Sequence, residues 1–159
     1  MRPLFFRSDE LRSLLLHRKI ATLDELKQAL GTSVDVTVFR KLKPLDYLTS
    51  YSHRGRYYTL REIARFDDKG LWSQAAVWFS QFGTLLATAE TVINRSPRGF
   101  FADELARALH VAVQDALHQL AVQRRVTRQL VSGLYLYTAI DRTVRQGQLL
   151  PRWRSRRKN

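Results

Sequence analysis

Cationic and hydroxyl side chains gather on one side of a predicted helix over residues 33–43, where they can contact bases and phosphates. At about 100° per residue, Val34, Val38 and Leu42 share an apolar side that faces a core. The opposite side and its border carry Ser33, Val36, Thr37, Arg40, Lys41 and Lys43. Arginine can form paired hydrogen bonds with a guanine edge, while threonine and valine can contact phosphate or a thymine methyl. The alternative is a solvated helix surface with ordinary cations.

A second group of cations follows at a predicted hairpin tip. Residues 48–52 and 56–60 are rich in threonine and tyrosine, which favour strands. His53, Arg54 and Arg56 lie at the turn between them, with Gly55 where a positive φ is expected. The tip therefore offers positive charge next to the predicted helix.

Two further helices must position these groups. Thr22 and Glu25 form a predicted capping box, and Gly31 is expected to end that helix in the left-handed conformation. A helix over residues 8–18 directs three leucines inward, and either Thr32 or Ser33 is expected to cap the helix that stops before Pro44.

The order of three helices followed by a hairpin, over residues 7–60, resembles the winged helix-turn-helix superfamily of DNA-binding domains. The resemblance implies that residues 33–43 are a recognition helix and residues 48–60 a wing. It also implies that double-stranded DNA is the partner. We assign residues 1–66 to this first domain.

An aromatic-rich connector, residues 67–83, follows a possible helical extension over residues 61–66. Residues 67–70 predict a turn, and Leu71, Trp72 and residues 76–80 predict a short buried strand. Large aromatic side chains in so short a stretch favour packing within the chain. An exposed aromatic patch for a partner protein is the alternative.

The same plan then repeats over residues 84–140. Asp103, Glu104 and Leu105 match Asp24, Glu25 and Leu26, and a one-residue shortening between the helices aligns the later positions of the two copies. The second half therefore also resembles a winged helix, with a recognition-like helix over residues 111–121 and a wing over residues 126–138. We therefore expect a fold that is mainly α with small β-hairpins (α+β), arranged as two winged helix-turn-helix modules in tandem.

The second copy differs where DNA would be read. The alignment places Gln114, Asp115, His118 and Ala121 at the positions of Val36, Thr37, Arg40 and Lys43. The candidate DNA contacts of this half are Gln114, His118, Arg124, Arg125 and Arg128. This half is either a weaker or differently oriented DNA contact, or a surface for a homodimer or another protein.

Residues 141–159 form a basic C-terminal segment, with a short helix expected over residues 141–148. Its cations are Arg152, Arg154, Arg156, Arg157 and Lys158. Blocks of like charge usually stay disordered until they meet a polyanion. The tail is expected to add phosphate contacts, or else only to aid solubility.

Bulk properties narrow the function. The 159 residues carry a net charge of +13 and a pI near 10.9, which favours polyanionic partners. Cysteine is absent, and neither a signal peptide nor a membrane span is recognisable. We expect a cytoplasmic protein, nucleoid-associated in a prokaryote.

No nucleotide-binding, metal-binding or catalytic motif is present, so we expect no catalytic residue, no cofactor and no metal. The expected function is duplex DNA binding, sequence-specific, by a transcriptional regulator or DNA-targeting component. The alternatives are an interaction scaffold within a nucleoprotein assembly, an RNA binder and a non-specific architectural protein, with a nuclease last.

Overall fold

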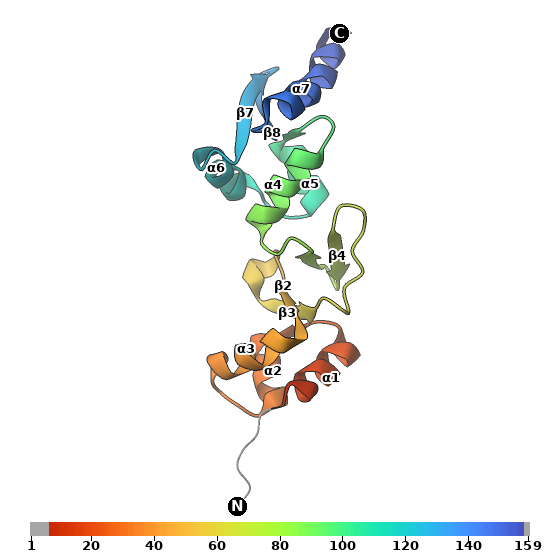
Figure 1. Ribbon diagram of the computed structural model, residues 1–159, viewed down its shortest axis with the longest axis vertical. Coiled ribbons are helices and arrows are strands. Elements are labelled where there is room, and N and C mark those ends of the chain that lie inside the picture. Colours follow the sequence, from red (N-terminus) through yellow and green to blue (C-terminus); the bar gives the residue numbers. More distant parts are fainter. Residues whose placement is uncertain (1–6, 158–159) are drawn as a thin grey trace, which may run out of the picture. The chain divides into compact units, whose positions relative to one another are not determined.

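A computed structural model of the protein describes residues 7–157, with side chains up to residue 154. The chain divides into two compact units, Met1–Thr84 and Leu85–Asn159, and each is described by itself. The regular elements of the described residues are helices and three small antiparallel sheets, so the α+β class is confirmed (Figure 1).

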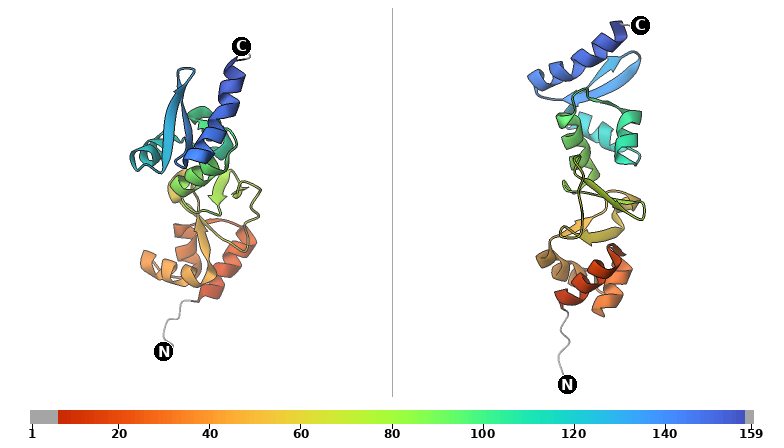
Figure 2. Two further views of the ribbon diagram at one scale, coloured as in Figure 1. Left: turned by 45° about the horizontal axis from the view of Figure 1, so that its top comes forward. Right: turned by 90° about the vertical axis from the view of Figure 1, so that its right-hand side faces the viewer.

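The first unit places three helices beside a three-stranded sheet and a separate two-stranded hairpin. In chain order its elements are α1 (Ser8–Arg18), β1 (Ala21–Thr22), α2 (Leu23–Leu30), α3 (Asp35–Leu42), a 3-10 turn (Lys43–Leu45), β2 (Tyr47–Thr49), a second 3-10 turn (His53–Gly55), β3 (Tyr57–Leu60), β4 (Leu71–Gln74) and β5 (Val77–Ser80). The sheet order is β1-β3-β2. The hairpin of β2 and β3 extends from the helices (Figures 1 and 2).

The second unit repeats the order of helices and strands from α1 to β3, and it has a C-terminal helix where the first unit has the β4–β5 hairpin. Its elements are α4 (Leu85–Arg95), β6 (Phe100–Phe101), α5 (Ala102–Leu109), α6 (Gln114–Val122), β7 (Val126–Val131), β8 (Leu134–Ala139) and α7 (Arg142–Arg157). The sheet order is β6-β8-β7, which is the order of the first unit's sheet.

The start and end of α2 match the sequence signals. Thr22 Oγ1 accepts a hydrogen bond from the Glu25 amide (3.3 Å), and Glu25 Oε1 accepts one from the Thr22 amide (2.9 Å). Gly31 ends the helix with φ 82°. The predicted capping box and glycine stop are therefore confirmed.

The start of α3 differs from the prediction. Val34 is the residue before the helix, no side chain caps it, and it is 52% exposed instead of facing the core. Thr32 Oγ1 accepts a hydrogen bond from the Val34 amide (3.1 Å), and this local turn makes the helix begin later, at Asp35. The apolar side of α3 is therefore formed by Val38 and Leu42, both fully buried.

Strand pairing relates the two units by one constant offset, the one that takes Tyr58 to Tyr137. The pairs Ala21–Tyr58 and Tyr47–Leu60 correspond to the pairs Phe100–Tyr137 and Val126–Ala139. Gly31 and His110, which end α2 and α5 at positive φ, keep the same offset. The predicted one-residue shortening between the helices is therefore wrong.

Residues 67–83 are part of the first unit and not a connector. The Asp67 carboxylate accepts the amides of Lys69 and Leu71 (2.9 Å each) and so begins the β4–β5 hairpin. Phe79 of this hairpin is fully buried in a cluster with Leu48 of β2. The predicted single strand is thus two strands, and turns replace the helix expected over residues 61–66.

The C-terminal segment is helical where a disordered tail was expected. Helix α7 continues through Pro151 to Arg157, because it packs on the sheet with Leu149 against Val131 and Leu136. Lys158 lies outside the described residues, as do the side chains of Arg156 and Arg157. Arg154 is exposed.

Candidate nucleic-acid interface

The outward side of α3 carries its polar residues to the surface. Val36 is 61% exposed, and Ser33, Arg40 and Lys43 are also exposed, while Thr37 and Lys41 are half-buried. Among the described residues, Arg40 and Lys43 form no ion pair. Their charges are therefore available to an external anion.

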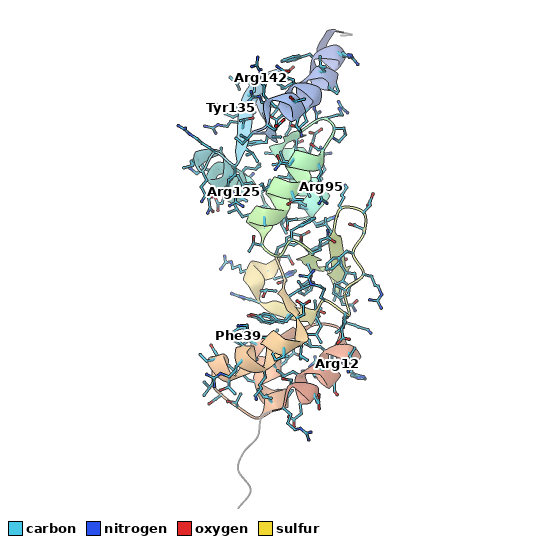
Figure 3. The ribbon with its side chains drawn as sticks, viewed as in Figure 1. Arg12, Phe39, Arg95, Arg125, Tyr135 and Arg142 are labelled. Atoms are coloured by element: carbon cyan, nitrogen blue, oxygen red, sulfur yellow. The ribbon has the colours of Figure 1, made fainter. Side chains whose placement is uncertain are left out.

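Packing beneath α3 fixes the direction of this surface. The Phe39 ring lies between α3 and the strands, with its centroid 5.7 Å from that of Tyr58 and 6.2 Å from that of Tyr47 (Figure 3). Ser8 Oγ of α1 donates to the Lys41 carbonyl (2.8 Å). Asp35, the acidic residue in the first turn, pairs with Lys27 of α2. The helix is therefore held from both sides, and its acid is neutralised internally.

The tip of the β2–β3 hairpin forms a cationic hollow of about 310 Å³. His53, Arg54 and Gly55 all have positive φ, and the Gly55 amide donates to the Ser52 carbonyl (3.1 Å). The positive φ expected at Gly55 thus extends over three residues of a tight turn. His53, Arg54, Arg56 and Tyr57 line the hollow, and its three basic residues are exposed. An anion can approach all three.

The β4–β5 hairpin forms hydrogen bonds with the residues that precede this tip. Ser52 Oγ accepts the Trp78 amide (2.8 Å) and lies 2.8 Å from His53 Nδ1. The Tyr51 amide donates to the Trp78 carbonyl (3.0 Å), and burial raises the pKa of the Tyr51 phenol, with the Asp67 charge adding to the effect. Sequence reasoning missed Ser52, because its role depends on a strand 26 residues away.

The second unit lacks the cations of α3. The constant offset places Asp115, Ala116, Gln119 and Val122 at the positions of Val36, Thr37, Arg40 and Lys43. The predicted equivalents, Gln114 and His118 among them, are one residue off. Gln114 and His118 are exposed on α6, but neither occupies the position of Arg40.

The second hairpin has an apolar tip in place of a cationic one. Ser132 and Gly133 form the turn at positive φ, and Leu130, Leu134 and Tyr135 are exposed around it. The Arg128 guanidinium lies 4.5 Å from the centroid of the Tyr135 ring. The two hairpins therefore present different chemistry on the same backbone plan.

Two predicted DNA contacts in the second unit form internal ion pairs. Arg125 Nε donates to Glu90 Oε2 (2.7 Å), and Arg125 Nη1 donates to Gln123 Oε1 (3.2 Å). Arg152 Nη2 donates to Glu104 Oε1 (2.6 Å) and to the Gly99 carbonyl (3.2 Å). Arg125 and Arg152 are therefore each engaged within the second unit, and their contact with phosphate stays a prediction.

The Arg152–Glu104 pair gives a pH prediction. Burial raises the pKa of Glu104, but hydrogen bonds from Arg152 and the Phe101 amide outweigh it and lower the pKa below 4.5. The stabilisation is then present above pH 4.5 and lost as the pH falls through the lowered pKa. Glu104→Gln should destabilise the second unit by about 1 kcal/mol at neutral pH, discounted because the pair is partly solvated.

Thermal unfolding of wild type and Glu104→Gln between pH 7 and pH 3 measures this. The difference between the two proteins should shrink as the solution becomes more acidic. A difference that is constant across this range contradicts the assignment.

Within residues 7–157 no group of three or more metal-ligating side chains is found. No helix among these residues is both long enough and apolar enough to span a membrane. Comparison with family models, curated proteins and solved structures finds no match to this chain.

Proposed function

We propose that both units are winged helix-turn-helix modules and that the first binds duplex DNA without catalysis. Helix α3 enters the major groove, and the tip of the β2–β3 hairpin contacts the backbone or the minor groove. The observation that carries this proposal is the exposure of Arg40 and Lys43 on α3, together with Arg54 and Arg56 on the hairpin of the same unit. Two elements of one unit thus present exposed cations.

The chemistry of α3 suits base reading as well as phosphate binding. Arg40 can form two hydrogen bonds with guanine O6 and N7, and Val36 can contact a thymine methyl. Ser33 and Thr37 can donate to phosphate oxygens, which positions the helix without reading sequence. Lys43 adds charge at the end of the helix, where Pro44 stops it.

Selection of bound fragments from a random duplex pool at two salt concentrations tests the proposal. The full chain should enrich a sequence motif, and its affinity should fall as salt rises because condensed counterions are released. Salt-sensitive binding without a motif would instead indicate an architectural protein. Preference for structured RNA over duplex DNA would overturn the proposal.

The paired substitution Arg54→Ala/Arg56→Ala should weaken binding to all duplexes by a similar factor. The slope of log K against log salt is negative, and each lost phosphate contact makes it less steep by about 0.9, so the double substitution should make it less steep by about 2. Titrations at several salt concentrations measure it. The control Lys69→Ala/Arg107→Ala removes the same charge from exposed positions elsewhere. An equal loss in the control would mean that net charge alone sets the affinity.

A further inference from the structure

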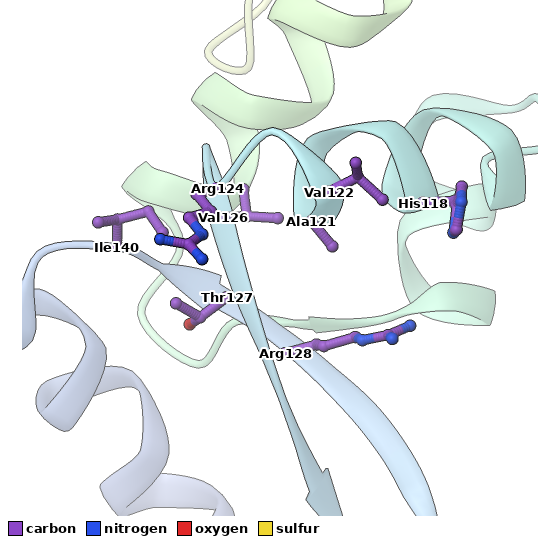
Figure 4. Close-up of a pocket in the computed structure, with 8 residues that line it drawn as sticks. All are labelled: His118, Ala121, Val122, Arg124, Val126, Thr127, Arg128 and Ile140. Atoms are coloured by element: carbon purple, nitrogen blue, oxygen red, sulfur yellow. The ribbon is translucent and has the colours of Figure 1, made fainter.

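The second unit contains a hollow of about 500 Å³ between α6 and the β7–β8 hairpin (Figure 4). Its floor is apolar, formed by Ala121, Val122, Val126 and Ile140. Val122 is 67% exposed and Ile140 is 42% exposed. A concave and mostly apolar surface of this volume is typical of a binding site.

Comparison with the first unit explains why the hollow exists. The constant offset places His118, Ala121 and Val126 at the positions of Phe39, Leu42 and Tyr47. In the first unit the rings of Phe39 and Tyr47 pack together, 6.2 Å apart, and Leu42 is fully buried. Smaller side chains at all three positions leave the same place unfilled in the second unit. The hollow is therefore the space that larger side chains fill at the equivalent place in the first unit.

Two cations border the apolar floor. Arg124 and Arg128 line the hollow (Figure 4) and are exposed. Arg107, Arg125 and Arg152 of the same unit pair with carboxylates, but Arg124 and Arg128 form no ion pair within the described residues. The complement of this surface is a bulky apolar group flanked by negative charge.

We propose that this hollow binds an acidic segment of another protein, with one aromatic or branched aliphatic side chain in the hollow and carboxylates at Arg124 and Arg128. The site goes beyond the DNA-binding role and does not depend on it. A nucleic acid backbone would cover Val122 and Ile140 without gaining apolar contacts. A second copy of this chain, with its net charge of +13, would bring repulsion to the two arginines.

Selection from a displayed random-peptide library on the immobilised full chain tests the site. Enriched peptides should contain a large apolar residue flanked by aspartate or glutamate. Ala121→Leu restores the residue type that stands at the equivalent position, Leu42, and should fill the hollow. It should weaken the synthesised best peptide at least tenfold, with duplex DNA affinity unchanged.

The substitutions Arg124→Glu and Arg128→Glu change exposed residues at the border of the hollow and provide a second test that leaves its apolar floor unchanged. Each should also weaken the peptide at least tenfold. No enriched motif, or a peptide that Ala121→Leu leaves unaffected, would overturn the proposal. A loss of DNA affinity equal to the loss of peptide affinity would also overturn it, because nucleic acid would then be the occupant. A dimer that Ala121→Leu dissociates would overturn it as well, because the occupant would then be a second copy of the chain.

Discussion

Replacing Arg40 by alanine is expected to remove the sequence preference of the protein and to weaken the selected duplex about 10- to 100-fold, the range of a lost paired contact with guanine. The side chain is exposed on α3, and Val38 and Leu42 hold the opposite side of the helix in the core. The substitution therefore removes a contact without disturbing the packing. Competition between the selected duplex and a scrambled duplex measures the effect.

Arg40→Lys is the matched control, because it keeps the charge but loses the planar pair of donors. We expect it to retain binding to the scrambled duplex and to lose most of the preference for the selected one. If Arg40→Ala binds the selected duplex as well as wild type does, α3 does not read bases at this position.

Replacing Gln148 by alanine is expected to destabilise the second unit by about 2–4 kcal/mol, since several buried groups lose their partners. Gln148 is 2% exposed. Its Nε2 donates to the carbonyls of Ile93 (2.7 Å) and Ser96 (3.0 Å), and its Oε1 accepts the Ala139 amide (2.8 Å). One side chain of α7 thus joins α4, the loop after it and β8.

Hydrogen exchange of the full chain measures this loss in each unit separately. Amides of α4 and β8 should exchange faster in Gln148→Ala, and amides of the first unit should be unchanged. Gln146→Ala, at an exposed position of the same helix, should leave both units as in wild type. Equal exchange in the two variants would show that α7 does not anchor the unit.

The sequence predicted the helix boundaries and buried positions that depend only on neighbouring residues. Thr22, Glu25 and Gly31 act on their own neighbours, so the boundaries of α2 follow from composition and spacing. The burial of Val38 and Leu42 follows from helical periodicity in the same way. Val34 does not, because the Thr32 hydroxyl competes for its amide before the helix begins.

Features that depend on distant partners could not be predicted. Residues far apart in sequence meet in the Phe79 core contact, in the hydrogen bond from the Trp78 amide to Ser52 Oγ, and in the Arg152–Glu104 ion pair. Charge alone indicated that Arg152 lies in a free tail, because the sequence does not show that Glu104 faces it. Counting every arginine of the basic C-terminal segment therefore overestimates how many of its cations are unpaired.

The exposure of the candidate residues on α3 and at the first hairpin was predictable from the sequence, whereas the equivalent positions on α6 were assigned one residue too early. The alignment matched residue identities, such as Thr49 with Thr127, whereas strand pairing sets the register by hydrogen bonds. With the correct register, smaller residues at 118, 121 and 126 stand at the positions of larger ones in the first unit. The hollow is explained by that comparison, which the shifted alignment concealed.

Amide chemical-shift mapping of the full chain with its selected duplex tests the central claim most directly. We predict that the largest shifts fall in residues 33–43 of α3 and its start and in residues 52–57 of the first hairpin, which carry the exposed cations. Shifts confined to residues 114–131 of the second unit, or to the C-terminal helix alone, would contradict the assignment of DNA binding to the first unit.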